Sequence, residues 1–294
     1  MSDKLRAYLQ LHFSVLIWGF TAILGKLITL KALPLVWWRV VICCATLLVL
    51  VPRAQFKDIP RQTLRRMFGI GFLVGLYWLC FYGAIKLSNA SIAVATMATA
   101  SFFAAIVEPM FMRTRIKPLE LSLGLLILPG MALIVGNIDW HMRLGFAVGV
   151  LSALLAAVFS SMNKKLIDHA PPPPLLMSLV ELSGGMLVCS LLLPFAVHDP
   201  ASELLPTQAD WLWLFLLSWV CTLLPYSLSL LSLRHVSAFV ANLSINLEPV
   251  YGIILAAILF QEHKDLKPQF YIGVLIILLA VFSHPLLKSR FEKV

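Results

Sequence analysis

Ten stretches of about twenty apolar residues divide the chain, and short polar or charged loops separate most of them. A helix of about 20 apolar residues crosses a hydrocarbon core of about 30 Å, where only helices and closed barrels satisfy their own backbone groups. Long unbroken runs exclude the barrel. The pattern therefore predicts an all-α polytopic membrane protein with ten transmembrane helices, at residues 9–30, 33–51, 67–85, 90–112, 119–136, 144–162, 175–197, 211–233, 236–260 and 270–287.

Composition agrees with a membrane protein, because 60% of residues are hydrophobic and 13% are charged, with a mean hydropathy of +0.91. Soluble domains average about 25% charged residues. The net charge of +9 could indicate a nucleic-acid partner, but most of the 23 Lys and Arg residues lie in alternate loops. The positive-inside rule then predicts two cytoplasmic termini, and we expect a bacterial inner-membrane protein without a nucleic-acid partner.

The chain shows weak internal similarity. Residues 88–95 align with residues 234–241, and Lys117-Pro118 aligns with Lys267-Pro268 a few positions out of register. Five spans in each half make the halves opposite in orientation, an arrangement typical of secondary carriers. We therefore predict two inverted five-helix repeats, residues 1–139 and 140–294, within one membrane domain.

The chain resembles the EamA-type ten-helix carriers of the drug/metabolite transporter superfamily. The residues that carry this resemblance, in order, are Trp18-Gly19, Lys26, Pro34, Arg39, the Ser91 and Ser237 segments, Glu262, and Gln269 to Gly273. The resemblance covers nearly the whole chain. It implies export of small metabolites, often amino acids or related compounds, from a central cavity lined mainly by spans 1, 3, 4, 6, 8 and 9.

Charged residues inside spans are candidate functional groups, because each costs about 2.5–3.5 kcal/mol on insertion scales. Lys26 and Arg39 lie near the outer ends of their spans. Lys26 can reach water by extending its side chain, so we interpret it as a structural charge. Arg39 needs carboxylate or carbonyl partners, which indicates a gating or anchoring role, with substrate contact as a lesser alternative. We expect Glu181 to pair with Lys164 or Lys165 rather than with Arg39.

Glu248 is the strongest candidate, since it lies near the middle of span 9 and cannot reach water. We interpret it as a ligand for a substrate amine or a proton-coupling carboxylate. The alternative is a protonated glutamate bonded to a neighbouring helix. Along a continuous helix, Ser237, Ser244, Glu248 and Tyr251 share one face, and Asn246 belongs to an adjacent polar stripe.

Aromatic side chains within the spans supply a second candidate surface. Trp18, Trp78, Tyr82 and Tyr226 combine apolar area with one polar group, which suits a pocket for zwitterions or aromatic metabolites. Ordinary helix packing is the alternative for each of them. Gly71 and Gly75 form a GxxxG pair in span 3, which predicts a close contact with another helix.

These features favour a secondary carrier that exports amino acids or related metabolites by alternating access, with proton coupling left open. Multidrug efflux and uptake of sugars or nucleotide sugars are alternatives within the carriers. An enzyme is disfavoured, because the seven histidines are scattered without an HExxH motif and no GxxxxGK[ST] loop occurs. The five cysteines lie within spans without ligand spacing, so we expect no metal, disulfide or cofactor. The chain could be a monomer or a homodimer.

Overall fold

The computed structural model describes residues 2–169, 171–245, 247–264 and 266–291, and within these ranges it contains helices and connecting loops but no strand. Eight helical segments are long and apolar enough to cross a membrane, which confirms an all-α protein with several spans. They are Asp3–Leu27, Ala32–Leu50, Arg61–Leu87, Ala90–Met112, Pro118–Asn137, Trp140–Asp168, Pro174–Ala196 and Gln208–Ser232. Two shorter apolar helices, Val250–Phe260 and Pro268–Ala280, lie where the last two spans are predicted.

Individual elements are shorter than the predicted spans in several places. In chain order they are α1 (Asp3–Trp18), α2 (Thr21–Leu27), α3 (Ala32–Leu50), η1 (Arg53–Phe56), α4 (Arg61–Leu87), α5 (Ala90–Met97), α6 (Ala100–Met112), α7 (Pro118–Asn137), η2 (Trp140–Met142), α8 (Arg143–His169), α9 (Pro174–Ala196), α10 (Pro200–Glu203), α11 (Gln208–Phe215), η3 (Leu216–Leu223), α12 (Leu224–Ser232), α13 (Ala238–Ile245), α14 (Glu248–Phe260), η4 (Glu262–Lys264) and α15 (Pro268–Phe291).

Spans 1, 4 and 9 are interrupted, whereas the sequence predicts each as one continuous helix. The interruptions separate α1 from α2, α5 from α6, and α13 from α14. Ser237 and Ser244 lie before the interruption of span 9, and Glu248 and Tyr251 lie after it, so their common face remains a prediction. Asn246 lies outside the described residues. Interrupted helices near the middle of a membrane are a recurrent feature of carriers, because the half-helix ends can serve a binding site.

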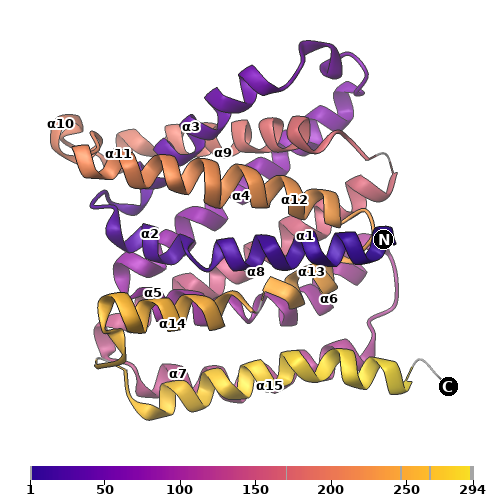
Figure 1. Cartoon of the computed structure of the whole chain (residues 1–294), viewed down its shortest axis with the longest axis vertical. Coiled ribbons are helices and arrows are strands. Elements are labelled where there is room, and N and C mark those ends of the chain that lie inside the picture. Colours follow the sequence, from indigo (N-terminus) through magenta and orange to yellow (C-terminus); the bar gives the residue numbers. More distant parts are fainter. Residues whose placement is uncertain (1, 170, 246, 265, 292–294) are drawn as a thin grey trace.

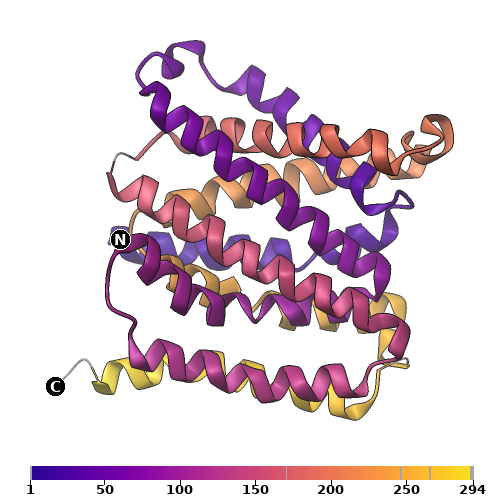
Figure 2. The same ribbon diagram turned by 180° about the vertical axis from the view of Figure 1, so that it is seen from behind.

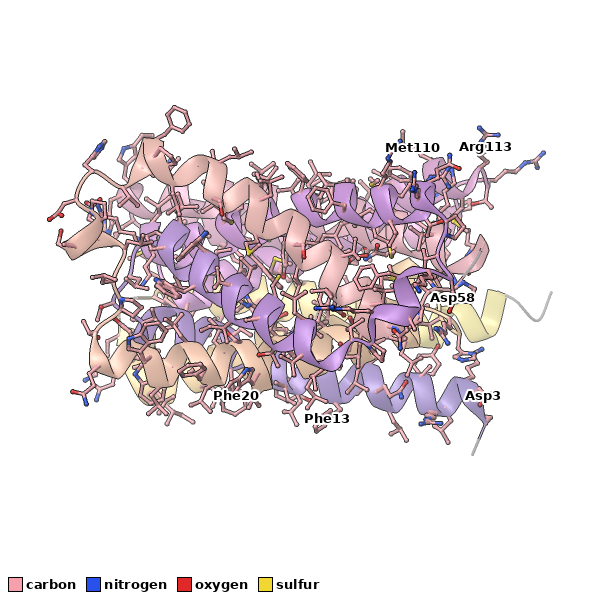
Figure 3. The ribbon with its side chains drawn as sticks, turned by 90° about the horizontal axis from the view of Figure 1, so that it is seen from above. Asp3, Phe13, Phe20, Asp58, Met110 and Arg113 are labelled. Carbon is pink, nitrogen blue, oxygen red and sulfur yellow. The ribbon has the colours of Figure 1, made fainter. Side chains whose placement is uncertain are left out.

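The helices lie side by side with their axes roughly aligned (Figure 1). The start of α1 and the end of α15 lie at the same end of the bundle in both views (Figures 1 and 2). Asp3, Asp58 and Arg113 also lie toward this end, which we call the near end (Figure 3). The opposite, far end holds η4 and the turn between α2 and α3. Along one edge α7 and α15 form a pair, in which a Cβ at Gly130 would lie 2.6 Å from the carbonyl oxygen of Gly273.

Helices α4 and α9 approach through glycines, which confirms the close contact predicted for Gly71 and Gly75. A Cβ at Gly71 would lie 1.9 Å from the carbonyl oxygen of Glu181, and one at Gly75 would lie 2.8 Å from Cα of Gly185. Opposite them, a Cβ at Gly184 would lie 2.2 Å from the carbonyl oxygen of Phe68. The backbone of α9 that carries Glu181 is thus fixed directly against the backbone of α4.

The variant Gly71→Ala should destabilise the protein, because its methyl group would overlap the Glu181 carbonyl and force the two backbones apart. Such overpacking typically costs about 1–3 kcal/mol, so the apparent Tm in detergent should fall by roughly 2–10 °C. The matched control is Gly69→Ala in the same helix, since a Cβ there meets nothing within 4 Å. Equal melting temperatures for the two variants would contradict this account of the contact.

Candidate functional site

A small internal cavity lies among spans 1, 2, 3, 4, 6, 8 and 9, with a volume of about 70 Å³. Its walls include Leu11 of α1, Asn163 of α8 and Leu233 after α12, so it extends from the middle of the bundle toward the near end. One water needs about 10–15 Å³ of such space, whereas pockets for drug-sized ligands measure about 300–1,000 Å³. In this conformation the cavity has room for a few waters, and a metabolite requires it to widen.

Arg39 brings a fixed positive charge to the cavity wall, with a residue exposure of only 2%. Its Nε donates to Thr222 Oγ1 at 2.7 Å, and Nη1 donates to the Tyr82 hydroxyl at 2.9 Å. The guanidinium carbon lies 3.8 Å from the centre of the Trp78 ring. These two bonds involve two of the five N–H donors of the guanidinium, so others can bind a ligand.

A π-helical stretch, η3, positions the partners of Arg39. Within it, the Thr222 hydroxyl donates to the Leu217 carbonyl at 2.6 Å, which orients Thr222 Oγ1 as an acceptor for Arg39. The Ser218 hydroxyl donates to the backbone carbonyl of Arg39 at 3.3 Å. The wide turn of a π-helix moves side chains out of the α-helical register, and such stretches often occur at functional sites. Hydrophobic periodicity gave no signal for it.

Glu248 lies at the start of α14, lines the same cavity as Arg39 and is 3% exposed. This position agrees with its expected location near the middle of span 9. The helix N-terminus is a favourable place for negative charge. No ion pair among the described residues joins Glu248 to Arg39, although the arginine is close enough to act on it electrostatically. The cavity therefore has a carboxyl group and a guanidinium group on its walls, with no ion pair between them among the described residues.

Glu181 is fully buried one layer behind the cavity wall. Its Oε2 accepts hydrogen bonds from Asn163 Nδ2, at 3.2 Å, and from the Tyr226 hydroxyl. Its other oxygen, Oε1, and the neighbouring Asn163 Oδ1 have no hydrogen-bond partner among the residues that the structure describes. Asn163 and Tyr226 both line the cavity, so they connect this carboxyl group to it. Lys164 pairs with Asp168 at 2.7 Å, so the expected pairing of Glu181 with Lys164 is wrong.

The remaining predicted residues divide between the cavity wall and its surroundings. Trp18, Trp78 and Tyr226 line the cavity. Tyr82 is fully buried outside that wall, where its hydroxyl holds Arg39. The Ser244 hydroxyl donates to the Val240 carbonyl at 3.0 Å, and Ser244 is not among the cavity-lining residues. Asn163 was missed by sequence analysis, because an asparagine followed by two lysines near the end of a span indicates a membrane interface.

A polar network closes the far end. Glu262 is buried and pairs with Lys26 at 2.7 Å. It also accepts bonds from the Ser91 hydroxyl at 2.6 Å, from Ser91 N at 3.0 Å and from Ala90 N at 3.3 Å. These backbone donors are at the N-terminus of α5, an electrostatically favourable place for an anion. Lys26 also lies over the Phe260 ring, with 4.5 Å to its centre. One carboxylate thus joins spans 1, 4 and 9.

A second contact at the far end involves span 8. Asp210, at the start of α11, accepts a bond from Thr29 N at 2.7 Å and another from the Thr29 hydroxyl at 2.7 Å. The same carboxylate caps α11 together with Thr207. In the adjacent turn, Lys86 Nζ donates to the Ile28 carbonyl at 2.6 Å. These contacts hold the turn between α2 and α3 against spans 3 and 8, so the far end is tied across several helices.

Comparison with known proteins agrees with this architecture. The model of the EamA-like transporter family matches the chain twice, over residues 5–136 and 143–283. A probable amino-acid metabolite efflux pump of Salmonella typhimurium is 30% identical over 228 residues, which are 74% of this chain and 75% of the relative. A solved crystal structure with 17% sequence identity shares the fold, with a TM-score of 0.67 over 96% of this chain and 97% of its own.

The far-end network should depend on pH. Burial alone would raise the pKa of Glu262, but hydrogen bonds from Lys26 and Ser91 outweigh it and hold the pKa below its usual value of 4.5. A lowered folded-state pKa means that the carboxylate stabilises the fold at neutral pH and that this contribution is lost as pH falls below about 4.5.

The variant Glu262→Gln should therefore lower the apparent Tm at pH 7 by roughly 3–6 °C, because charged hydrogen bonds are lost. Melting curves from pH 7 to pH 3.5 should show the difference from wild type shrinking as the pH falls. Glu120→Gln is a control, since Glu120 is a buried carboxylate paired with Lys117 at 3.0 Å, outside this network. A difference that stays constant with pH would contradict a charged Glu262.

Proposed function

The chain belongs to the EamA-like transporter family, and we propose that it exports amino acids or closely related zwitterionic metabolites by alternating access. The observation that carries this proposal is the cavity with Arg39 on one wall and Glu248 on another. A substrate with a carboxylate and an ammonium group matches both charges, whereas an uncharged sugar would leave both without a partner. The similarity to a probable amino-acid metabolite efflux pump supports the same substrate class.

In this proposal the guanidinium of Arg39 binds the substrate carboxylate. Thr222, Tyr82 and Trp78 fix the plane of the guanidinium, so the remaining donors do not have to be ordered when the substrate binds. A planar guanidinium can give two parallel hydrogen bonds to a carboxylate, and these are stronger in a site from which water is excluded. The aromatic walls formed by Trp18 and Tyr77 would contact the apolar part of the substrate.

Glu248 would receive the ammonium group, and it is also the carboxylate best placed for proton exchange. Either role requires the charge of Glu248 to be compensated when the substrate leaves, by a proton or by Arg39. When the zwitterion leaves, Arg39 and an ionised Glu248 compensate each other, whereas a proton taken up by Glu248 leaves the cavity with the single positive charge of Arg39. This coupling is part of the proposal, and it makes export depend on the pH difference across the membrane.

The topology proposed for this cycle has ten spans arranged as two inverted five-helix repeats, residues 1–139 and 140–294. The two separate family matches and the common end of the termini support it (Figures 1 and 2). The excess of basic residues in the near-end loops supports a cytoplasmic near end, in a bacterial inner membrane. With this orientation, the cavity extends toward the cytoplasm while the Glu262 network closes the outer side.

Replacing Arg39 by lysine tests the carboxylate-binding role. Lysine keeps the positive charge but lacks the planar fork that Thr222, Tyr82 and Trp78 hold, so the KM for an amino-acid substrate should rise about tenfold or more. Proteoliposomes loaded with a panel of amino acids and their decarboxylated amines would give the flux. Transport of the amines, which carry no carboxylate, should change little in Arg39→Lys.

An equal loss for amino acids and amines would assign Arg39 a purely structural role. The melting temperature of Arg39→Lys must be measured alongside, because the side chain is buried. If no member of the panel is transported by the wild-type protein in either direction, the proposed substrate class is wrong.

Replacing Glu248 by glutamine tests the two proposed roles of its carboxylate, ammonium binding and proton exchange. Glutamine has the same shape but cannot bind or release a proton, so flux should fall at least about tenfold and lose its dependence on an imposed pH gradient. Glu120→Gln is again the control, since Glu120 is a buried carboxylate outside the cavity. Flux by Glu248→Gln that matches wild type across a pH series would exclude both roles of Glu248.

A further inference from the structure

An apolar groove lies at the near end between α3, α4 and α9, and none of its lining residues lines the substrate cavity. Its volume is about 500 Å³. Its lining is mostly aliphatic and aromatic, including Leu48, Phe56, Leu64, Phe68 and Leu179, with Arg65 as its charged member. We propose that this groove binds an anionic phospholipid, with an acyl chain between the helices and the phosphate at Arg65.

The groove opens onto the surface that faces the hydrocarbon. At the end of α3, Leu48 is 67% exposed, Val49 86% and Leu50 55%. An apolar surface of this kind is normal for a helix surrounded by lipid. An empty groove of this size would lose dispersion contacts along all of its walls. In a bilayer the nearest material that can fill it is an acyl chain.

Charge complementarity identifies the head group. The segment from η1 to the second turn of α4, which contributes Phe56, Leu64 and Arg65 to the groove, carries one acidic residue, Asp58, and five exposed basic residues, Arg53, Lys57, Arg61, Arg65 and Arg66. Basic clusters between transmembrane helices at a membrane surface bind anionic head groups. A zwitterionic head group would add a positive charge to this cluster, so an anionic lipid fits better.

The start of α4 adds backbone donors at the same place. Its N-cap is Pro60, which provides no side-chain cap for the first turn. The N–H groups in the first turn of a helix have no acceptor within the helix and point toward a bound anion. Arg65 is one turn further along the same helix, so its guanidinium and these N–H groups can share one phosphate.

The depth of the groove matches part of an acyl chain. Helix α9 begins at Pro174, and its groove-lining residues are Leu179, Val180 and Ser183. At a rise of 1.5 Å per residue, Ser183 is about 13 Å from the start of the helix. A chain that enters beside Arg65 therefore extends well below the head-group level. It would lie against Val180, which precedes the buried Glu181 of the transport site.

Native mass spectrometry of the full chain in neutral detergent can test the proposal. The protein would be incubated with phosphatidylglycerol or phosphatidylcholine, and the retained lipid counted after collisional removal of detergent. We expect wild type to retain phosphatidylglycerol preferentially. Arg65→Gln should retain it about fivefold less, the factor expected for one basic side chain near a charged head group. Leu64→Trp keeps all of the charges but fills the groove, and it should lose the lipid as well.

Arg115→Gln is the matched control, because Arg115 is an exposed basic residue in the loop between α6 and α7, whereas the groove lies among α3, α4 and α9. Melting temperatures of all variants would show that they remain folded. Equal retention of the two lipids by wild type, or equal retention by Arg65→Gln and Arg115→Gln, would overturn the proposal. So would full retention by Leu64→Trp, or competition by millimolar inorganic phosphate, which would indicate a site for free anions.

Discussion

The permanent charge of Arg39 within a bundle surrounded by hydrocarbon is the constraint on which the rest of the site depends. A guanidinium cannot lose its proton in a protein, so the fold must surround it with acceptors and π electrons. Thr222 and Tyr82 accept its hydrogen bonds, and the Trp78 ring covers its face. Two spans besides its own, spans 3 and 8, are thereby tied to one side chain. None of these partners neutralises the charge, which is why the cavity remains attractive to a carboxylate.

Close backbone packing explains how the polar groups can be held this rigidly. In lipid, helices are not driven together by the hydrophobic effect, and their association relies on van der Waals contact and hydrogen bonds. Gly71 and Gly184 let α4 and α9 meet at backbone distance, so the position of Glu181 is fixed by main-chain contact. Gly19 similarly lies against Tyr251 at the break in span 1, where a Cβ would be 2.7 Å from the tyrosine Cβ. The interruption of span 1 is therefore packed against the first turn of α14, near the cavity.

Much of the fold followed from the sequence, because the thickness of the hydrocarbon sets the length of each apolar run. The burial of Glu248 also followed, since its distance from either end of a span depends only on the rise of a helix.

The interaction partners of the charged residues could not be predicted from the sequence. Lys26 and Glu262 are 236 residues apart, and Glu181 bonds Tyr226 from another helix. Such pairs depend on how helices are rotated about their axes, and apolar runs that are hydrophobic on all sides give no indication of rotation. The break in span 9 was also missed, as no glycine marks it.

The two ends of the bundle differ in the kind of contact that closes them, and this difference bears on how a carrier could change state. At the far end, Glu262 and Asp210 each accept several short hydrogen bonds from other spans. At the near end, the contacts beside the cavity include single bonds to backbone carbonyls, such as Lys164 Nζ to Leu233 at 3.0 Å and Arg234 to Pro172 at 2.8 Å. Charged networks need water when they separate, whereas single bonds to carbonyls exchange with water at little cost. A cycle that opens the far end must therefore admit water to Glu262. A substrate that compensates the charges of the cavity would bring the state closed at the far end and the state closed at the near end closer in free energy.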